Sequence, residues 1–199
     1  LSMTLIHLAG DYAKACVSLA NIVVVFVPLV AGLFTTVYWY YADRFTELLL
    51  TQPLSRSDVF FARLISICTS LGLSFVIGIN LAFLVHGTFN LGLVLLDLSG
   101  VFLTIIFVVL GALVGVSVPD RMKGVGLALG IWFYFTIVHD ALILVILLAL
   151  RDYPLDLLSA FLGAINPIGL SRVVLLMYHE ASLLLGHTGA LVRKMLTEG

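Results

Sequence analysis

Four long apolar runs, separated by short polar segments, restrict this chain to one kind of fold. The runs cover residues 17–41, 59–85, 98–118 and 125–150, and each is long enough to cross a bilayer as a helix. Hydrophobic residues make up 62% of the chain and charged residues only 11%, which a soluble domain of this length does not have. We therefore expect an all-α integral membrane protein, a polytopic helix bundle with four transmembrane helices and with Asp97 in the loop before the third.

Several classes of function are not supported by the charge and the motifs. A net charge of -1 provides no basic field for nucleic acid. Neither a phosphate-cradling glycine loop nor a Ser/His/Asp or acidic catalytic cluster stands out, so we expect neither ATP binding nor catalysis. The potential soft ligands Met177, His179, His187 and Met195 do not have the spacing of a recognised metal site, and no metal is expected.

The polar stretch between the first two runs, residues 42–58, is the clearest candidate for contact with another protein. Its residues 45–49 have the pattern of a brief amphipathic helix. Pro53 ends that helix because it lacks an amide hydrogen and disfavours helical angles in the residue before it. Ser55 followed three residues later by Asp58 has the spacing of a capping box. The stretch therefore predicts helix, break and helix at a membrane surface.

Basic residues predict how the chain is oriented. Arg44, Arg56, Arg63, Arg121 and Lys123 flank one membrane face, whereas Lys14 and Arg151 flank the other. By the positive-inside rule, the face with residues 42–58 is cytoplasmic. Residues 1–16 are then an extracytoplasmic lead-in, and residues 151–199 are extracytoplasmic as well. Because the chain begins at Leu1 rather than at a Met, we expect it to be part of a longer protein.

The last leucine-rich segment does not form a clean span. Asn166, Pro167 and Arg172 interrupt every window of about 20 residues, and an isolated arginine at mid-membrane would be costly. We expect residues 155–165 and 170–185 to form amphipathic helices on the outer interface, joined at Asn166 and Pro167 and followed by a polar loop.

Asp140, with His139 beside it, is the most unusual polar feature inside the apolar runs. An ionisable group within the membrane is a functional candidate by default. Two plainer interpretations remain open: Asp140 is a structural hydrogen-bond partner in the bundle, or it is protonated. Asn80 is a weaker signal of the same kind, which interhelical hydrogen bonding explains.

Two glycine pairs have the spacing that lets membrane helices approach closely. Gly111 and Gly115 lie in the third run, and Gly126 and Gly130 in the fourth. The pattern is common in membrane helices, so it predicts close packing without naming a partner.

Three stretches resemble a known family. Residues 47–58 are similar to the cytoplasmic coupling segment of ABC-2 type transporter permeases. Residues 126–140, together with Asn166 and Pro167 followed by Arg172, resemble the NosY-like branch, the permeases of nitrous-oxide-reductase maturation transporters. The resemblance covers most of the chain.

This resemblance implies a permease of six spans in the bacterial inner (cytoplasmic) membrane, of which this chain would hold the second to the fifth. It implies a homodimer with two ABC ATPase subunits that bind ATP and Mg, and in this branch a periplasmic partner protein. The permease would bind no cofactor and would couple ATP hydrolysis to transport or to a conformational change at the periplasmic side, in copper or sulfur supply for nitrous oxide reductase maturation. The implied ATPase-coupling interface comprises Phe45, Glu47, Leu48, Gln52, Pro53 and Arg56.

Two other functions remain as alternatives. The chain would be a membrane anchor of a periplasmic complex if its role needed no nucleotide. It would be a membrane-embedded enzyme if Asp140 and His139 formed an acid/base pair, although no further convergent polar groups accompany them.

Overall fold

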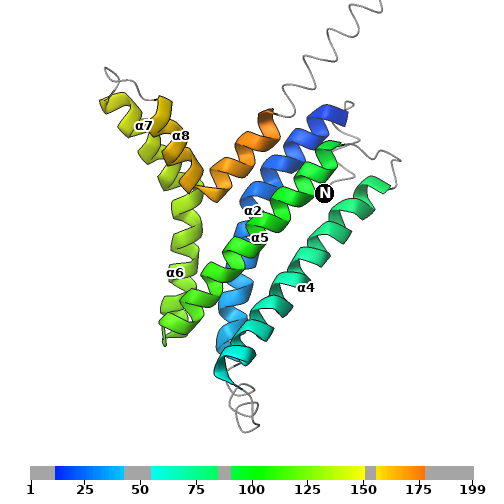
Figure 1. Cartoon of the computed structure of the whole chain (residues 1–199), viewed down its shortest axis with the longest axis vertical. Coiled ribbons are helices and arrows are strands. Elements are labelled where there is room, and N and C mark those ends of the chain that lie inside the picture. The colour runs from blue at the N-terminus through cyan, green and yellow to red at the C-terminus, as the bar shows by residue number, and fades with distance from the viewer. Residues whose placement is uncertain (1–11, 43–54, 85–90, 151–155, 178–199) are drawn as a thin grey trace, which may run out of the picture.

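The computed structural model describes residues 12–42, 55–84, 91–150 and 156–177, and every element in these ranges is a helix (Figure 1). In chain order they are α2 (Tyr12–Tyr41), α4 (Arg56–Leu84), α5 (Leu91–Ser117), α6 (Arg121–Phe133), the π-helical turn η1 (Tyr134–Val138), α7 (His139–Ala149), α8 (Asp156–Ile165) and the Pro167–Met177 helix. Four of these helical stretches are long and apolar enough to cross a membrane, with α6, η1 and α7 together forming the fourth. The predicted polytopic helix bundle is therefore confirmed.

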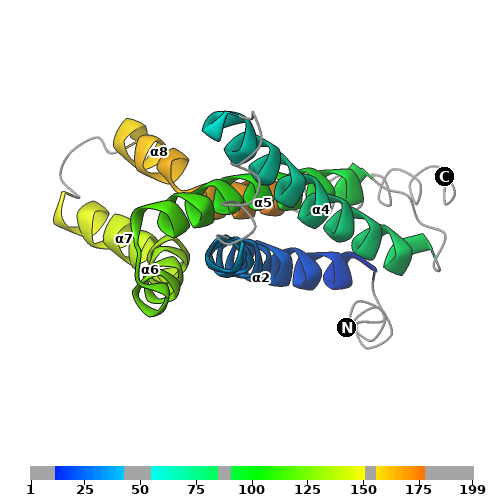
Figure 2. The same cartoon turned by 90° about the horizontal axis from the view of Figure 1, so that it is seen from below.

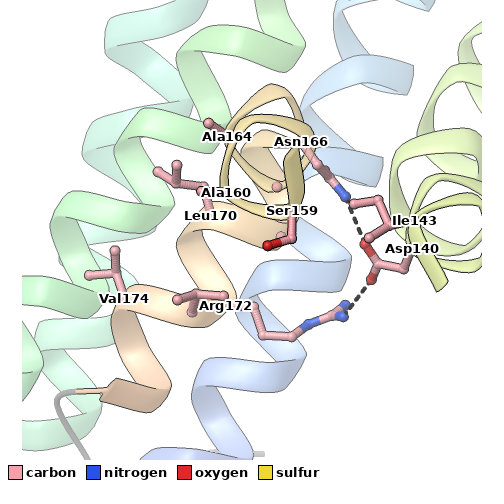
Figure 3. A pocket seen from close by; sticks show the side chains of 12 residues that line it. Asp140, Ile143, Ser159, Ala160, Ala164, Asn166, Leu170, Arg172 and Val174 are labelled. Carbon is pink, nitrogen blue, oxygen red and sulfur yellow. Dashed lines mark hydrogen bonds and ion pairs between the residues drawn. The ribbon is translucent and has the colours of Figure 1, made fainter. Parts of the chain in front are cut away.

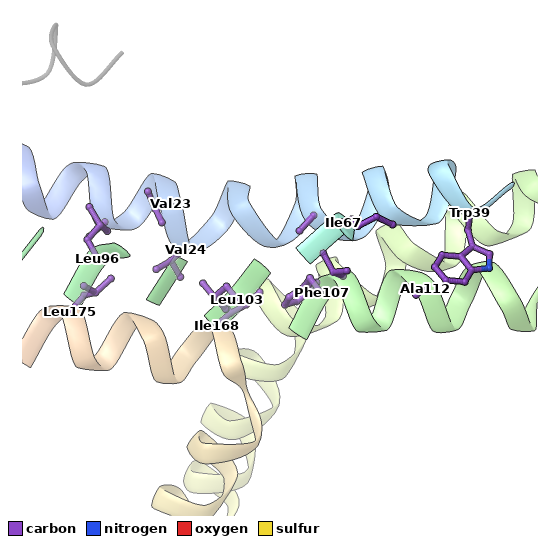
Figure 4. Packing of buried hydrophobic residues seen from close by; sticks show 13 residues of the cluster. Val23, Val24, Trp39, Ile67, Leu96, Leu103, Phe107, Ala112, Ile168 and Leu175 are labelled. Carbon is purple, nitrogen blue, oxygen red and sulfur yellow. The ribbon is translucent and has the colours of Figure 1, made fainter. Parts of the chain in front are cut away.

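The core of the bundle is built on α2 and α5, which run in the same direction. The Thr36 hydroxyl donates to the Gly111 carbonyl at 3.1 Å, and the Tyr40 hydroxyl donates to the Val118 carbonyl at 2.8 Å. Figure 4 shows buried side chains of these two helices meeting the Pro167–Met177 helix. The buried cluster consists of Ala20, Val23, Val24, Ala31, Trp39, Ile67, Leu96, Leu103, Phe107, Val108, Ala112, Ile168 and Leu175.

Only one of the two glycine pairs is used for close packing among the described residues. A Cβ on Gly111 would lie 2.6 Å from the Gly32 carbonyl oxygen, and one on Gly115 would lie 2.6 Å from the Trp39 Cβ. Gly126 and Gly130 have the same spacing, but an added Cβ there would meet nothing within 4 Å. The first pair thus lets α5 approach α2, whereas the second lies on an open face of α6.

The third membrane helix begins earlier than its apolar run. We expected Asp97 in a loop, but α5 already begins at Leu91 and contains it. The reason is a partner on the neighbouring helix: the Asn80 side-chain amide of α4 donates to Asp97 Oδ2 at 2.6 Å. A carboxylate with such a partner can remain within a helix of the bundle.

The segment after residue 155 forms a helical hairpin, with the two expected helices joined at Asn166 and Pro167. Its two arms, Leu158–Ile165 and Pro167–Met177, are bent by 110° at Asn166. The second arm begins at Pro167, three residues before our expectation, because Asn166 Oδ1 accepts the Ile168 amide hydrogen at 3.1 Å and proline suits the first helical position. Ile168 and Leu175 of this arm belong to the buried core, so the arm packs inside the bundle.

The helices diverge around this hairpin. α5 contacts both α2 and α4. α6 also contacts α2 and α5, and the span then continues through η1 into α7, which leans away from them (Figures 1 and 2). The hairpin lies between α7 on one side and α2 and α5 on the other. Its α8 arm is beside α7, and its Pro167–Met177 arm is beside α2 and α5 (Figure 1). Its tip therefore points into the bundle, toward the π turn.

Candidate functional site

The predicted coupling stretch is described only at its end. Phe45, Glu47, Leu48, Gln52 and Pro53 lie outside the described residues. Arg56 is the exposed first residue of α4. The helix restart predicted there is confirmed, because Ser55 Oγ accepts the Asp58 amide hydrogen at 3.1 Å.

Basic and aromatic side chains gather at the same end of the bundle. The Arg63 guanidinium lies 4.8 Å from the centre of the Trp39 ring and donates to the Ala42 carbonyl at 3.2 Å. The Arg121 guanidinium lies 4.1 Å from the centre of the Tyr41 ring and donates to its hydroxyl. Such cation–π contacts hold the ends of α2, α4 and α6 together at one end of the bundle.

A polar cluster of Asp140, Asn166 and Arg172 lies where the hairpin meets α7 (Figure 3). Arg172 Nη1 donates to Asp140 Oδ2 at 2.9 Å, and Asn166 Nδ2 donates to Asp140 Oδ1 at 3.0 Å. The aspartate comes from α7, whereas its two partners come from the hairpin tip and the arm that follows. An arginine that would be costly alone in the membrane thus has a carboxylate partner.

The π turn explains how the hairpin tip is held against the fourth span. The His139 amide donates to the Tyr134 carbonyl, five residues back, instead of to the Phe135 carbonyl, its partner in an α-helix. The Phe135 oxygen is thereby released, and Asn166 Nδ2 donates to it at 2.9 Å. Asn166 is 1% exposed, so these bonds are made in the protein interior. The π turn in the fourth span thus supplies an acceptor for Asn166 at the bend of the hairpin.

An open cavity of about 520 Å³ adjoins the cluster. It lies between α7, α8 and the Pro167–Met177 helix, and its polar part is formed by Asp140, Ser159, Asn166 and Arg172 (Figure 3). Small and apolar residues line most of the rest, including Ile143, Ala160, Gly163, Ala164 and Leu170. The cavity is large enough for a small organic ligand.

His139 and Asp140 do not form a pair. Both carboxylate oxygens of Asp140 are bound by the hairpin, whereas His139 is buried with its ring 5.9 Å from that of Tyr134 and 6.3 Å from that of Phe135. Its Nδ1 has no hydrogen-bond partner among the described residues. The arrangement gives no geometric support to an acid/base pair of these two residues.

Asn80, the third intramembrane candidate, belongs to a separate polar contact. It bridges α4 and α5 through Asp97, whose Oδ1 is buried and has no partner within the described part of the chain. This contact does not join the Asp140 cluster.

Sequence reasoning singled out Asp140, Asn166 and Arg172 separately but did not bring them together. The available signal was charge: an acidic and a basic residue, each within a strongly apolar segment, are most stable as partners. The π turn had no such signal, because residues 134–138 are as apolar and aromatic as an ordinary membrane helix.

Comparison with known proteins adds one relative. No family model matches the chain. Over 177 residues it is 27% identical to the probable ABC transporter permease protein NosY of Stutzerimonas stutzeri, an alignment that covers 83% of this chain and 64% of that protein. The chain is similar to an ABC transporter permease. It spans less than two thirds of the length of that relative. The similarity supports the ABC transporter permease family at most and does not select one branch of it. Together with the four apolar helices, it indicates a multi-pass membrane protein and supports a permease role.

Proposed function

We propose that this chain is part of the membrane-spanning permease subunit of an ABC-2 type transporter. The observation that carries the proposal is the similarity to a permease over 177 residues, in a chain with four helices fit to cross a membrane. ATP and Mg would be bound by a partner ATPase subunit, and the permease would catalyse no reaction itself. Its role is to convert ATP-driven movement of that partner into movement of its membrane helices.

Residues 42–58 are proposed as the contact with the ATPase. They join the ends of α2 and α4, so a push on them acts on both helices directly. Arg56 is exposed and available to a partner. Phe45, Glu47, Leu48, Gln52 and Pro53 complete the proposed interface on the strength of the family resemblance. This face of the bundle would be cytoplasmic, in the bacterial inner membrane.

Contacts of α2 connect this interface to the polar cluster. Trp132 Nε1 of α6 donates to the Val25 carbonyl of α2 at 2.9 Å, just before the π turn. The Gly111 and Thr36 contact locks α2 to α5 nearer the proposed coupling stretch. A displacement of α2 would therefore reach α6 through Trp132 and act on the π turn that holds Asn166.

The assembly is proposed as a homodimer of permeases with two ATPase subunits. The resemblance to the NosY-like branch further suggests a periplasmic partner protein and a role in copper or sulfur supply for nitrous oxide reductase maturation. In this proposal the hairpin would transmit the conformational change toward the periplasmic side, because its arms open away from the coupling face (Figure 1).

The test is co-purification of the full membrane protein from gently extracted membranes, with mass spectrometry of its partners. We expect an ATP-binding subunit with the wild type and its loss with Glu47→Arg or Arg56→Glu. Lys123→Glu is the matched control, because it reverses an exposed charge on the same face outside residues 42–58. Absence of an ATP-binding subunit from the wild-type complex would contradict the proposal and favour a membrane anchor of a periplasmic complex.

A further inference from the structure

The polar cluster contains hydrogen-bond donors that no described acceptor uses. Asn166 uses both amide hydrogens, on Phe135 and Asp140, and its oxygen accepts from Ile168. Arg172 carries five N–H donors, yet its one hydrogen-bonding partner among the described residues is Asp140. The unused donors therefore belong to one side chain, the Arg172 guanidinium.

These donors border the cavity. The Arg172 side chain is 32% exposed, and it lines the cavity of about 520 Å³ beside Asp140. Wherever the bilayer keeps bulk water from this guanidinium, unpaired polar hydrogens are costly. A group rich in acceptor oxygens would satisfy them, and guanidinium binds phosphate and carboxylate better than any other acceptor.

The rest of the cavity suits an apolar group. Ala160, Gly163 and Ala164 of α8 form a low wall, and Leu170 and Val174 face it from the second arm (Figure 3). The space is several times that of a phosphate group and is lined almost entirely by small or aliphatic side chains. A bare anion would leave this apolar part empty.

We propose that the cavity between α7, α8 and the Pro167–Met177 helix binds an amphiphile whose oxyanion head group, a phosphate ester or a carboxylate, accepts hydrogen bonds from Arg172. Its apolar part lies against Ala160, Gly163 and Ala164. Asp140 holds the guanidinium in place through its own bond and leaves the remaining N–H groups directed at the head group. The inference needs only a membrane-embedded chain, so it does not depend on an ATPase partner.

The experiment titrates the full protein in detergent, without nucleotide, and detects bound molecules by native mass spectrometry. The probes are dioctanoyl phosphatidylglycerol, dioctanoyl glycerol with the same chains but no phosphate, and inorganic phosphate. We expect the wild type to bind the phospholipid at least tenfold more tightly than either of the other two. Arg172→Gln should lose at least tenfold of that affinity, and the matched Arg121→Gln at the other end of the bundle should lose none.

Two further variants guard against a folding artefact. Asp140→Asn combined with Arg172→Gln keeps the charge balance of the cluster and should also fail to bind. Gly163→Leu adds bulk to the apolar wall and leaves both residues of the ion pair in place, and its Cβ would meet nothing within 4 Å. It should lose the phospholipid, whereas Gly78→Leu, an equally open glycine on α4, should retain it.

Three results would overturn the proposal. One is phospholipid binding that is unchanged in Arg172→Gln and Gly163→Leu. Another is equal binding of dioctanoyl glycerol, which would show that the head group is not recognised. The third is Arg172-dependent binding of inorganic phosphate as tight as that of the phospholipid and unaffected by Gly163→Leu, which would assign the cavity to a free anion.

Discussion

Asn166 donates its side-chain amide to the Phe135 carbonyl oxygen at 2.9 Å, an acceptor that the π turn releases from its own helix. The same amide group bonds Asp140, so one side chain at a hairpin tip bridges two points of the fourth span. Each irregularity depends on the other. The π turn needs an external donor, and the tip needs acceptors inside an apolar bundle.

Deleting Ile137 should remove the acceptor that Asn166 uses on the fourth span. The deletion makes Tyr134 the fourth residue before His139, so His139 keeps its partner in α-helical geometry and the Asp140 amide hydrogen takes the Phe135 carbonyl. The buried Asn166 amide then lacks that acceptor, and we expect a loss of about 2 kcal/mol in stability, or about 4–8 °C in the unfolding midpoint. Thermal unfolding in detergent measures it.

The control for that deletion is removal of Leu148. It is 65% exposed and follows Asp140, so the cluster keeps its register. A midpoint that falls equally for both deletions would show that the Phe135 carbonyl released by the π turn does not stabilise the hairpin tip.

The Asp140 and Arg172 pair should show strong coupling in a double-mutant cycle. Arg172→Gln leaves a carboxylate that lacks its charged partner, and Asp140→Asn leaves an uncompensated guanidinium, so we expect each to lose about 1–2 kcal/mol. The double variant removes both charges and should lose less than the sum of the two. Both side chains are about one third exposed, which keeps the values below those of a fully buried pair. Additive losses in detergent unfolding would mean that the two residues do not stabilise each other.

The membrane helices could be predicted from sequence, because a run of apolar residues with few charges satisfies the bilayer as a helix whatever its neighbours are. Ser55 was predictable for a similar reason, since its capping bond reaches only Asp58. Asp97 and the Asn166 hairpin were not. Their positions depend on Asn80 and on the Phe135 carbonyl, which are distant in sequence and become partners only after the helices pack.

Gly111→Ala and Gly126→Ala should differ although both glycines belong to the same motif. The added methyl on Gly111 would lie 2.6 Å from the Gly32 carbonyl oxygen, so α2 and α5 must separate, and we expect a loss of about 1–3 kcal/mol. Gly126 faces open space in this chain, and alanine there should be neutral or slightly stabilising because of its helix propensity. Urea or thermal unfolding compares the two. Similar losses at both positions would mean that a second surface covers the Gly126 face.

The Asn80 and Asp97 contact should behave as a structural element. Asn80→Leu leaves the Asp97 carboxylate without its one amide donor among the described residues, and we expect a loss of about 1 kcal/mol. Adding Asp97→Leu removes the stranded carboxylate and should restore most of the stability. Unfolding of the two variants tests this. If the double variant is less stable than Asn80→Leu alone, the carboxylate has another stabilising partner.

Trp132→Phe should separate assembly from coupling. The substitution keeps an aromatic ring of similar shape but removes the N–H that donates to the Val25 carbonyl, the link from α2 to α6 just before the π turn. Residues 42–58 are untouched, so co-purification of an ATPase subunit should be unchanged. Stimulation of that ATPase by the permease should fall severalfold, because movement of α2 no longer reaches α6 through this bond.

The comparison needs a variant that perturbs aromatic packing elsewhere. Phe61→Leu on α4 serves, because its ring is 57% exposed, and it should leave stimulation intact. Full stimulation in Trp132→Phe would show that α2 and α6 move together through their apolar packing alone. Loss of the ATPase from the Trp132→Phe complex would instead place the defect in assembly, since the coupling stretch and the α2–α6 link would then not be separable.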